Sequence, residues 1–139
     1  MRFWDASAII PLCVTAAETE AVRSLAGDDP QMVVWWGSRV ECWSAFARKR
    51  REGVLDPPGE EAARSVLTKL YGSWTEILPG EELRLQAARL LRLHPLLAHD
   101  ALQLAAALTW AGHPQSGEIV AFDRRLLDAA RLEGLTPLP

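Results

Sequence analysis

Short apolar runs alternate with longer, partly apolar stretches along all 139 residues, and this alternation limits the possible folds more than any other feature. Short runs bounded by turn residues are typical of buried strands, whereas apolar residues spaced three and four apart indicate helices. We expect strands in the segment ending at Asp5 and at 32–36, 75–78, 118–123 and 135–138. Strands that are separated by helices predict an α/β domain whose mostly parallel sheet is covered on both faces.

Six of the intervening stretches have helical spacing. They are residues 18–26, 38–52, 63–70, 81–94, 100–112 and 124–134. We expect glycines to end four of these helices, since glycine is favoured just past a helix C-terminus: Gly27, Gly53, Gly112 and Gly134. Pro11 should interrupt a helical turn after the first strand. In the helix at 38–52 we expect Val40, Trp43 and Ala47 to share one apolar face.

Composition and charge narrow the class of protein. A chain with 49% hydrophobic and 24% charged residues fits one globular domain over 1–139, with no apolar stretch near the roughly 18 residues that span a bilayer. The formal net charge of −3, taken alone, argues against an RNA or DNA partner. Cys13 and Cys42 lie far apart in apolar segments, and no export signal is visible. We therefore expect a cytoplasmic protein with reduced thiols.

Four acidic residues stand at the starts of helices or the ends of strands. Asp5 ends the first strand, Glu41 lies in the first turn after the second, Asp123 ends the strand at 118–123, and Asp100 opens an apolar helix. Three of them should meet at one edge of the sheet, where ligands gather in open parallel sheets. Each has a plainer interpretation as a helix cap, and Ser38 with Glu41 matches a capping box.

The joint pattern favours a metal site over four separate caps, because the acids occur in the otherwise apolar settings FWDASA, LLAHDALQLAAA and IVAFDRRLL. Two carboxylates about 4 Å apart repel by roughly 4 kcal/mol at an effective dielectric constant of 20. Four together would therefore need a cation. Oxygen ligands without a His or Cys set favour Mg²⁺ or Mn²⁺ over zinc, and such sites commonly act on phosphoryl groups.

The segments FWDASAII, SRVE, HDALQLAAAL and VAFDRRLLDAARLEGL occur in this order over nearly the whole chain. As an ordered set, they resemble the acidic motifs of PIN-domain ribonucleases. The length of the chain most resembles the VapC-type toxins of bacterial toxin-antitoxin pairs. The resemblance implies a three-layer α/β/α sandwich with a five-stranded parallel sheet, and an endoribonuclease that hydrolyses RNA phosphodiester bonds with Mg²⁺ or Mn²⁺.

The resemblance also assigns roles to residues and partners. Asp5, Glu41 and Asp100 would be the central catalytic and metal-binding acids, and Asp123 would be the fourth, helping to hold a second metal ion or its water shell. Ser7 would orient Asp5 or a metal-bound water. The cognate antitoxin would wrap the toxin with an amphipathic segment and bring a basic side chain to the acidic site, and the toxin would form a symmetric dimer.

Several other residues allow two interpretations. Arg48 and Arg51 could contact RNA phosphates, yet basic residues in the last turn of a helix are favoured by the helix dipole alone. Arg124 directly follows Asp123, so it could reach a phosphate at the rim of the metal site or lie on a solvated face. The six tryptophans could stack on bases or serve as core and dimer contacts. His99, beside Asp100, is read as structural. Without the four acids, the remaining formal charge is +1, so the net charge does not exclude RNA.

Two other classes of protein fit the sequence poorly, whereas two alternatives among PIN proteins remain open. A haloacid-dehalogenase-type phosphatase would need a second acid where Ser7 stands. A phospho-receiver domain would need an acid pair after the first strand and a late lysine, whereas this chain has only Lys49 and Lys69. A catalytically silent PIN module that binds a partner is the rival from another class. A housekeeping RNA-processing nuclease is the alternative among active PIN proteins.

Overall fold

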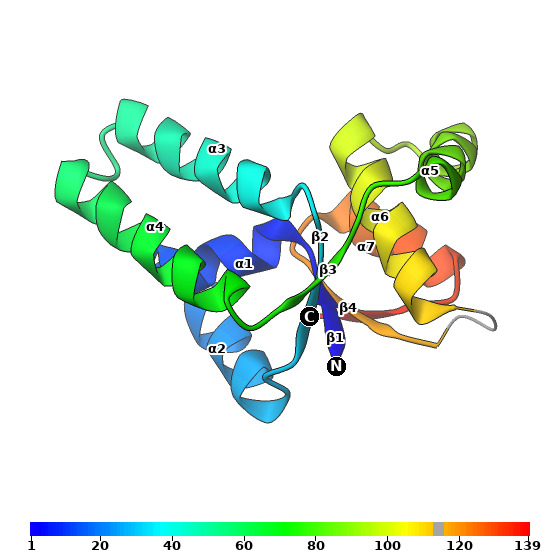
Figure 1. Cartoon of the computed structure of the whole chain (residues 1–139), viewed down its shortest axis with the longest axis horizontal. Coiled ribbons are helices and arrows are strands. Elements are labelled where there is room, and N and C mark those ends of the chain that lie inside the picture. The colour runs from blue at the N-terminus through cyan, green and yellow to red at the C-terminus, as the bar shows by residue number, and fades with distance from the viewer. Residues whose placement is uncertain (113–115) are drawn as a thin grey trace.

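The computed structural model describes residues 1–112 and 116–139. Five strands form one parallel sheet in the order β3-β2-β1-β4-β5, with β1 in the centre (Figure 1). The strands are β1 (Arg2–Trp4), β2 (Met32–Trp35), β3 (Thr75–Ile77), β4 (Glu118–Val120) and β5 (Thr136–Leu138). The chain builds the β2 side first and then crosses to β4, so the order reverses beside β1. Ligands bind outside the carboxyl ends of strands at such a switch point.

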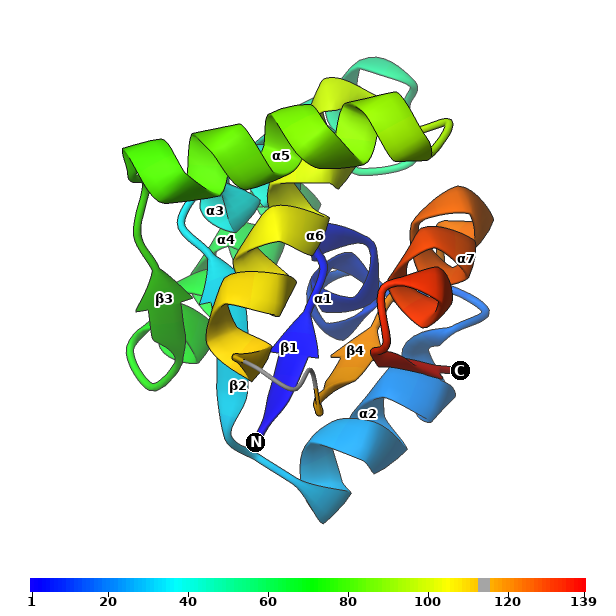
Figure 2. The same cartoon turned by 90° about the vertical axis from the view of Figure 1, so that its right-hand side faces the viewer.

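The sheet separates two apolar clusters because successive strand residues point to opposite faces. Phe3 packs into one cluster, and its neighbour Trp4 packs into the other. One face is covered by α1 (Ala6–Cys13), α2 (Thr19–Asp28), α3 (Ser38–Arg51) and α4 (Pro57–Tyr71). The other is covered by α5 (Glu81–Leu93), α6 (Ala98–Ala111) and α7 (Arg124–Leu132), with α5 packed on α6 (Figure 2). The expected three-layer α/β/α sandwich is confirmed.

Two expected helix breaks are wrong. Pro11 lies inside α1, which continues to Cys13, and Gly27 lies inside α2, which continues to Asp28. Pro11 removes one backbone donor from a helix of eight residues, and its buried ring packs where a polar group would be unfavourable. Gly53, Gly112 and Gly134 have positive φ angles and follow the ends of α3, α6 and α7, as expected.

The buried face of α3 differs from the expected one. Ser38, Cys42, Ala45 and Phe46 point into the protein, whereas Val40 is 57% exposed. Two sets of residues on this helix have helical spacing, and the packing of α3 against α1 and α4 selects the second set. The helix begins beside the ring of Trp35, where a Cβ on Gly37 would lie 2.5 Å from the indole nitrogen. Only glycine fits this turn from β2 into α3.

No helix in the described ranges is both long and apolar enough to cross a membrane.

Candidate functional site

Asp5 and Asp123 follow the neighbouring strands β1 and β4, and each caps the helix that comes next. An oxygen of Asp5 accepts the backbone N–H of Ser7 at 2.9 Å, and an oxygen of Asp123 accepts that of Leu126 at 3.0 Å. Caps of this kind satisfy the free donors of a first helical turn. The capping interpretation is therefore correct for both residues. In each case it occupies one carboxylate oxygen, Oδ2 of Asp5 and Oδ1 of Asp123.

Glu41 and Asp100 come from the first turns of α3 and α6. Asp100 accepts the backbone N–H of Leu97 at 3.3 Å, so it too supports a helix start. The expected capping box of Ser38 and Glu41 is wrong, because α3 begins after Gly37 without a side-chain cap. The hydroxyl of Ser38 is instead fully buried against α6. Glu41 is thus the one acid of the four that does not serve its own helix.

All four predicted acids line a single cavity of about 500 Å³ at the carboxyl edge of the sheet. Asp5 and Asp100 are almost fully buried, at 5% and 3% exposure. Side chains of α1, α3 and α6 complete the walls: Ala6, Ser7, Ile10, Val40, Ser44, Ala45, Arg48 and His99. The fold therefore brings together acids that are separated by up to 118 positions in the sequence.

Burial and neighbouring carboxylates raise the pKa of Asp5 and of Glu41. Burial raises the pKa of Asp5, and the charge of Asp100 adds to the rise, whereas hydrogen bonds from Ser7 oppose it. Burial raises the pKa of Glu41 to about 7, with further rises from Asp5 and Asp100 and an opposing hydrogen bond from Gln103. Like charges held in a poorly hydrated space favour the protonated forms. A cation in the cavity would relieve this repulsion.

Ser7 is positioned as expected for a residue that orients Asp5. Its hydroxyl donates to Oδ2 of Asp5 and accepts the backbone N–H of Phe122 at 2.9 Å. One hydroxyl therefore connects the acid after β1 to the segment after β4. This contact fixes the direction of the Asp5 carboxylate relative to Asp123.

Gln103 is a site residue that the sequence analysis missed. Its side chain is fully buried, and Nε2 donates to Oγ of Ser38 and to Oε1 of Glu41, both at 3.0 Å. A buried amide needs such partners, since unpaired it would be unfavourable. The available signal was a lone amide in the apolar run ALQLAAAL, one helical turn after Asp100. Gln103 thus holds the acid of α3 from the adjacent helix α6.

The basic residues are distributed unevenly around the cavity. Arg48 lines it. Arg51 instead lines a separate hollow between α3 and α4, and Arg124 is an exposed first residue of α7 that does not line the cavity. His99 places Nε2 3.1 Å from Oδ1 of Asp100 while remaining 56% exposed. Arg48 is therefore the one of the three predicted RNA-contacting arginines that lines the acidic cavity.

The tryptophans are mostly part of the packing. Trp4 and Trp35 are buried, and Trp43, Trp74 and Trp110 are partly buried. Trp36, at 48% exposure, is the tryptophan with the most accessible ring. The structure thus favours the packing interpretation for five of the six.

The donors in the cavity suit a hard divalent cation. They are carboxylate oxygens. The bonds from Ser7, Gln103 and Leu126 are accepted by Oδ2 of Asp5, Oε1 of Glu41 and Oδ1 of Asp123, so each of these bonds uses one oxygen of its acid. Within the described residues, no group of three or more His, Cys, Asp or Glu side chains is arranged so that it could hold a metal ion. The donor chemistry therefore fits an ion that keeps part of its water shell, as Mg²⁺ commonly does, and not one coordinated by protein atoms alone.

Fold and site together define a class: a three-layer α/β/α domain with an acidic cavity at the carboxyl edge of a parallel sheet. No family model matches the sequence, and no curated protein gives a significant match. Among solved structures, PAE2754 from Pyrobaculum aerophilum is similar, with 19% identity, a TM-score of 0.70 and coverage of 98% of this chain and 82% of that one. A chain of a toxin-antitoxin complex from Klebsiella pneumoniae is also similar, with 17% identity, a TM-score of 0.65 and coverage of 98% and 96%. At these identities, the likeness shows the fold.

Proposed function

We propose that this protein is the toxin of a toxin-antitoxin pair and acts as a Mg²⁺- or Mn²⁺-dependent endoribonuclease. The observation that carries the proposal is the meeting of Asp5, Glu41, Asp100 and Asp123 in one cavity. Helix capping does not require Asp5, Asp100 and Asp123 to share one cavity, and it does not explain Glu41, which caps no helix. The similarity to a chain of a toxin-antitoxin complex supports the toxin role.

The metal ion would be held partly through its water shell by Asp5, Glu41 and Asp100, with Asp123 contributing at the side of β4, because no three of these acids are arranged to hold an ion directly in the described residues. A bound Mg²⁺ or Mn²⁺ would supply an activated water and offset the charge of the attacked phosphate. The mutual repulsion of Asp5, Glu41 and Asp100 supports this role, since their burial without a cation is unfavourable.

The chain's own residues supply the remaining tasks. Without a metal ion, burial and the charges of Asp5 and Asp100 raise the pKa of Glu41 to about 7, so this carboxylate has a high proton affinity for an acid, and Gln103 fixes its Oε1. The Glu41 Oε2 atom, which Gln103 does not hold, would then accept a proton from the attacking water. Ser7 holds Asp5 in place. Arg48 would bind a substrate phosphate in the cavity, while Arg51 and Arg124 would contact the strand farther out.

The antitoxin would block this cavity. A basic side chain inserted among the four acids would offset their repulsion as a metal ion does, so inhibitor and metal would compete for one space. An amphipathic antitoxin segment would supply the rest of the contact.

The test is RNA cleavage by the purified chain with Mg²⁺ or Mn²⁺ and with excess EDTA. We expect cleavage only with metal, and loss of cleavage in Asp5→Asn and Asp100→Asn. Asparagine keeps an oxygen that can accept the N–H bonds at both positions, so the helix starts are retained. Asp128→Asn is the matched control, because Asp128 is an exposed acid on α7 outside the cavity. Cleavage that persists in EDTA, or in both cavity variants, would refute the nuclease proposal.

The toxin role is tested by expression without a partner. The wild-type chain should arrest growth, Asp5→Asn should not, and co-expression of the protein encoded by the adjacent gene should restore growth. Cleavage in vitro without growth arrest would favour the housekeeping nuclease instead.

A further inference from the structure

The acidic cavity extends beyond the four acids along two helices. Asp5 precedes α1 and Glu41 lies in the first turn of α3, so both helices begin at the acids, and Figure 1 shows them leaving the sheet on the same side. The lining of the cavity continues past the acids to Ile10 on α1 and to Arg48 on α3. At about 1.5 Å of rise per residue, the backbone of Arg48 lies about 10 Å beyond that of Glu41. The cavity therefore has an outer end that the proposed metal site does not use.

Three exposed residues of α3 line the cavity in one row: Val40, Ser44 and Arg48. Their spacing of four residues places them on one side of the helix. The row is apolar beside Glu41, carries a hydroxyl one turn later and ends in a guanidinium group. Ile10, from α1, adds a partly buried apolar side chain to the same cavity. The row therefore offers donors for a phosphate at the outer end and apolar surface on the way to it.

The polar groups of this row are available to a ligand. The hydroxyl of Ser44 makes no hydrogen bond with the described residues, whereas those of Thr68 and Thr109 donate to carbonyls of their own helices. Arg48 pairs with Glu52, with 3.9 Å between Nε and Oε1 and both side chains exposed, at 61% and 57%. A pair of this length and exposure contributes little to stability. Both Ser44 and Arg48 can therefore donate to a ligand in the cavity.

The two ends of the cavity have opposite charge. The inner end holds four acids, and Arg48 is the one lysine or arginine among the described residues that line the cavity. A divalent ion offsets only part of the charge of four carboxylates, so a strand with a negative charge on every phosphate is still repelled there. At the outer end, the N–H groups of a guanidinium attract a phosphate. This charge pattern suits two phosphates of one strand, one at each end.

We propose that the outer end of the cavity binds the phosphate next to the cleaved bond, held by Arg48 and Ser44. This inference rests on the proposed nuclease function. Side chains on a helix lean toward its N-terminus, so the guanidinium of Arg48 and the hydroxyl of Ser44 reach the same space. Val40 and Ile10 give apolar surface to the sugar or base between the two phosphates, and such contact does not distinguish one base from another. Arg48 and Ser44 thus position the strand, and the acids act on it.

The experiment replaces one phosphate at a time in a short single-stranded RNA with an uncharged methylphosphonate. Cleavage at one mapped bond is measured as kcat/KM with Mg²⁺ for the wild type and for Arg48→Met, which removes the charge and keeps an unbranched side chain. In the wild type, neutralising one linkage beside the cleaved bond should lower kcat/KM about tenfold. Arg48→Met should lose about tenfold on unmodified RNA, and less than about twofold more on the RNA neutralised at that linkage. Ser44→Ala should lose about threefold, at the same linkage.

Binding without metal gives a second measurement that does not depend on cleavage. Fluorescence anisotropy with the same RNAs is recorded in EDTA in an Asp100→Asn background, which lowers the repulsion at the inner end. Adding Arg48→Met should raise Kd about tenfold for unmodified RNA and less than about twofold for the RNA neutralised at one linkage. If the wild type cleaves no RNA with metal, the nuclease proposal fails, while this binding measurement still decides whether the subsite exists.

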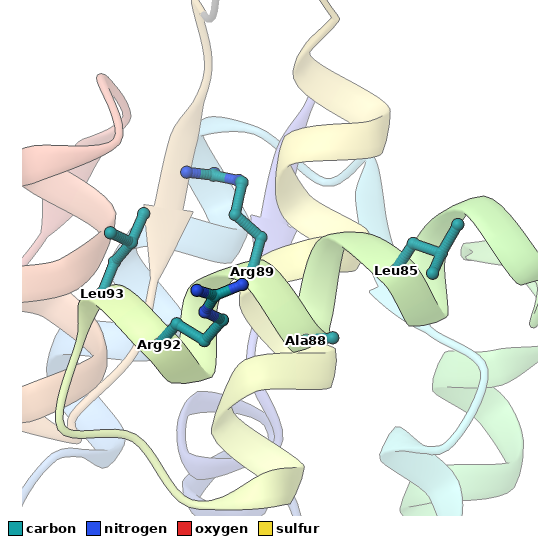
Figure 3. Close-up of a pocket in the computed structure, with 5 residues that line it drawn as sticks. All are labelled: Leu85, Ala88, Arg89, Arg92 and Leu93. Atoms are coloured by element: carbon teal, nitrogen blue, oxygen red, sulfur yellow. The ribbon is translucent and has the colours of Figure 1, made fainter.

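The matched control is Arg92→Met on α5. Arg92 is also an exposed arginine in a hollow with apolar walls, but no acid is among the described residues that line this hollow. Figure 3 shows the lining: Leu85, Ala88, Arg89, Arg92 and Leu93. Arg92→Met should leave kcat/KM, Kd and the effect of each neutral linkage unchanged. Thermal unfolding verifies that every variant folds.

Three outcomes would overturn the subsite. The first is that no single linkage loses its effect in Arg48→Met. The second is that a neutral linkage has the same effect in Arg48→Met as in the protein with Arg48, because the arginine then acts on the RNA only through its general charge or through the structure. The third is that Arg92→Met changes kcat/KM and Kd as much as Arg48→Met does.

Discussion

Glu41→Gln should make the metal-free protein more stable at alkaline pH and leave it nearly unchanged at acidic pH. Burial and the charges of Asp5 and Asp100 raise the pKa of Glu41 in the folded state from the ordinary 4.5 to about 7. Between these values, the folded state binds a proton that the unfolded state has lost. The stability associated with Glu41 is therefore fully present below about pH 4.5 and is lost as pH rises through about 7.

The magnitude follows from the size of that rise. At about 1.36 kcal/mol for each tenfold change in proton affinity, the rise to about 7 corresponds to about 3 kcal/mol. Glu41 is only partly buried, so solvent screening reduces the effect, and we expect about 1.5 kcal/mol. Glutamine has nearly the same shape, and its Oε1 can still accept the hydrogen bond from Gln103.

The assay is urea unfolding in EDTA at about pH 5 and about pH 8.5. At the higher pH alone, the free energy of unfolding of Glu41→Gln should exceed that of the wild type by about 1.5 kcal/mol. Glu82→Gln, at an exposed position in the first turn of α5, is the control and should show no such pH dependence. Adding Mg²⁺ at the higher pH should raise the free energy of unfolding of the wild type more than that of Glu41→Gln. An equal difference at both pH values would refute the reasoning.

Two further predictions concern the supports of the site. Gln103→Leu should lower the free energy of unfolding by about 1–3 kcal/mol, because Ser38 and Glu41 lose a buried partner; a change within error in urea unfolding would contradict this. Asp123→Ala should lower the free energy of unfolding by about 1 kcal/mol, because the cap to Leu126 is lost, whereas Asp123→Asn should retain the cap. Equal losses of stability for the two variants in thermal unfolding would contradict the capping role.

The sequence predicted the layers and the position of the site because both depend on strands. Strand residues alternate between faces, and the ends of parallel strands meet at one edge, so Asp5 and Asp123 could be placed without knowledge of the packing. Helix faces are less determined. In α3, the set Val40, Trp43 and Ala47 and the set that includes Phe46 both have helical spacing, and only contact with α1 and α4 decides between them.

Gln103 was missed for a related reason. Its importance comes from Ser38 and Glu41, which lie 65 and 62 positions away in the sequence. A single amide in an apolar helix indicates that a buried partner exists, but the pattern does not say which residue it is. Pro11 is the opposite case. A proline taken alone favours a helix break, but the packing of α1 keeps the helix continuous through it.

Capping and metal binding do not exclude each other for these acids, because a carboxylate has two oxygens. A parallel strand that leads into a helix places the first turn of the helix, with its free N–H groups, at the carboxyl edge of the sheet. An acid at that turn can give one oxygen to the backbone, as Asp5 does with Oδ2 and Asp123 with Oδ1, and direct the other into the cavity. The cap then fixes the carboxylate in position before any ligand arrives. Glu41 has no cap to serve and takes its support from Gln103 instead, which makes it the acid whose placement depends most on the tertiary fold.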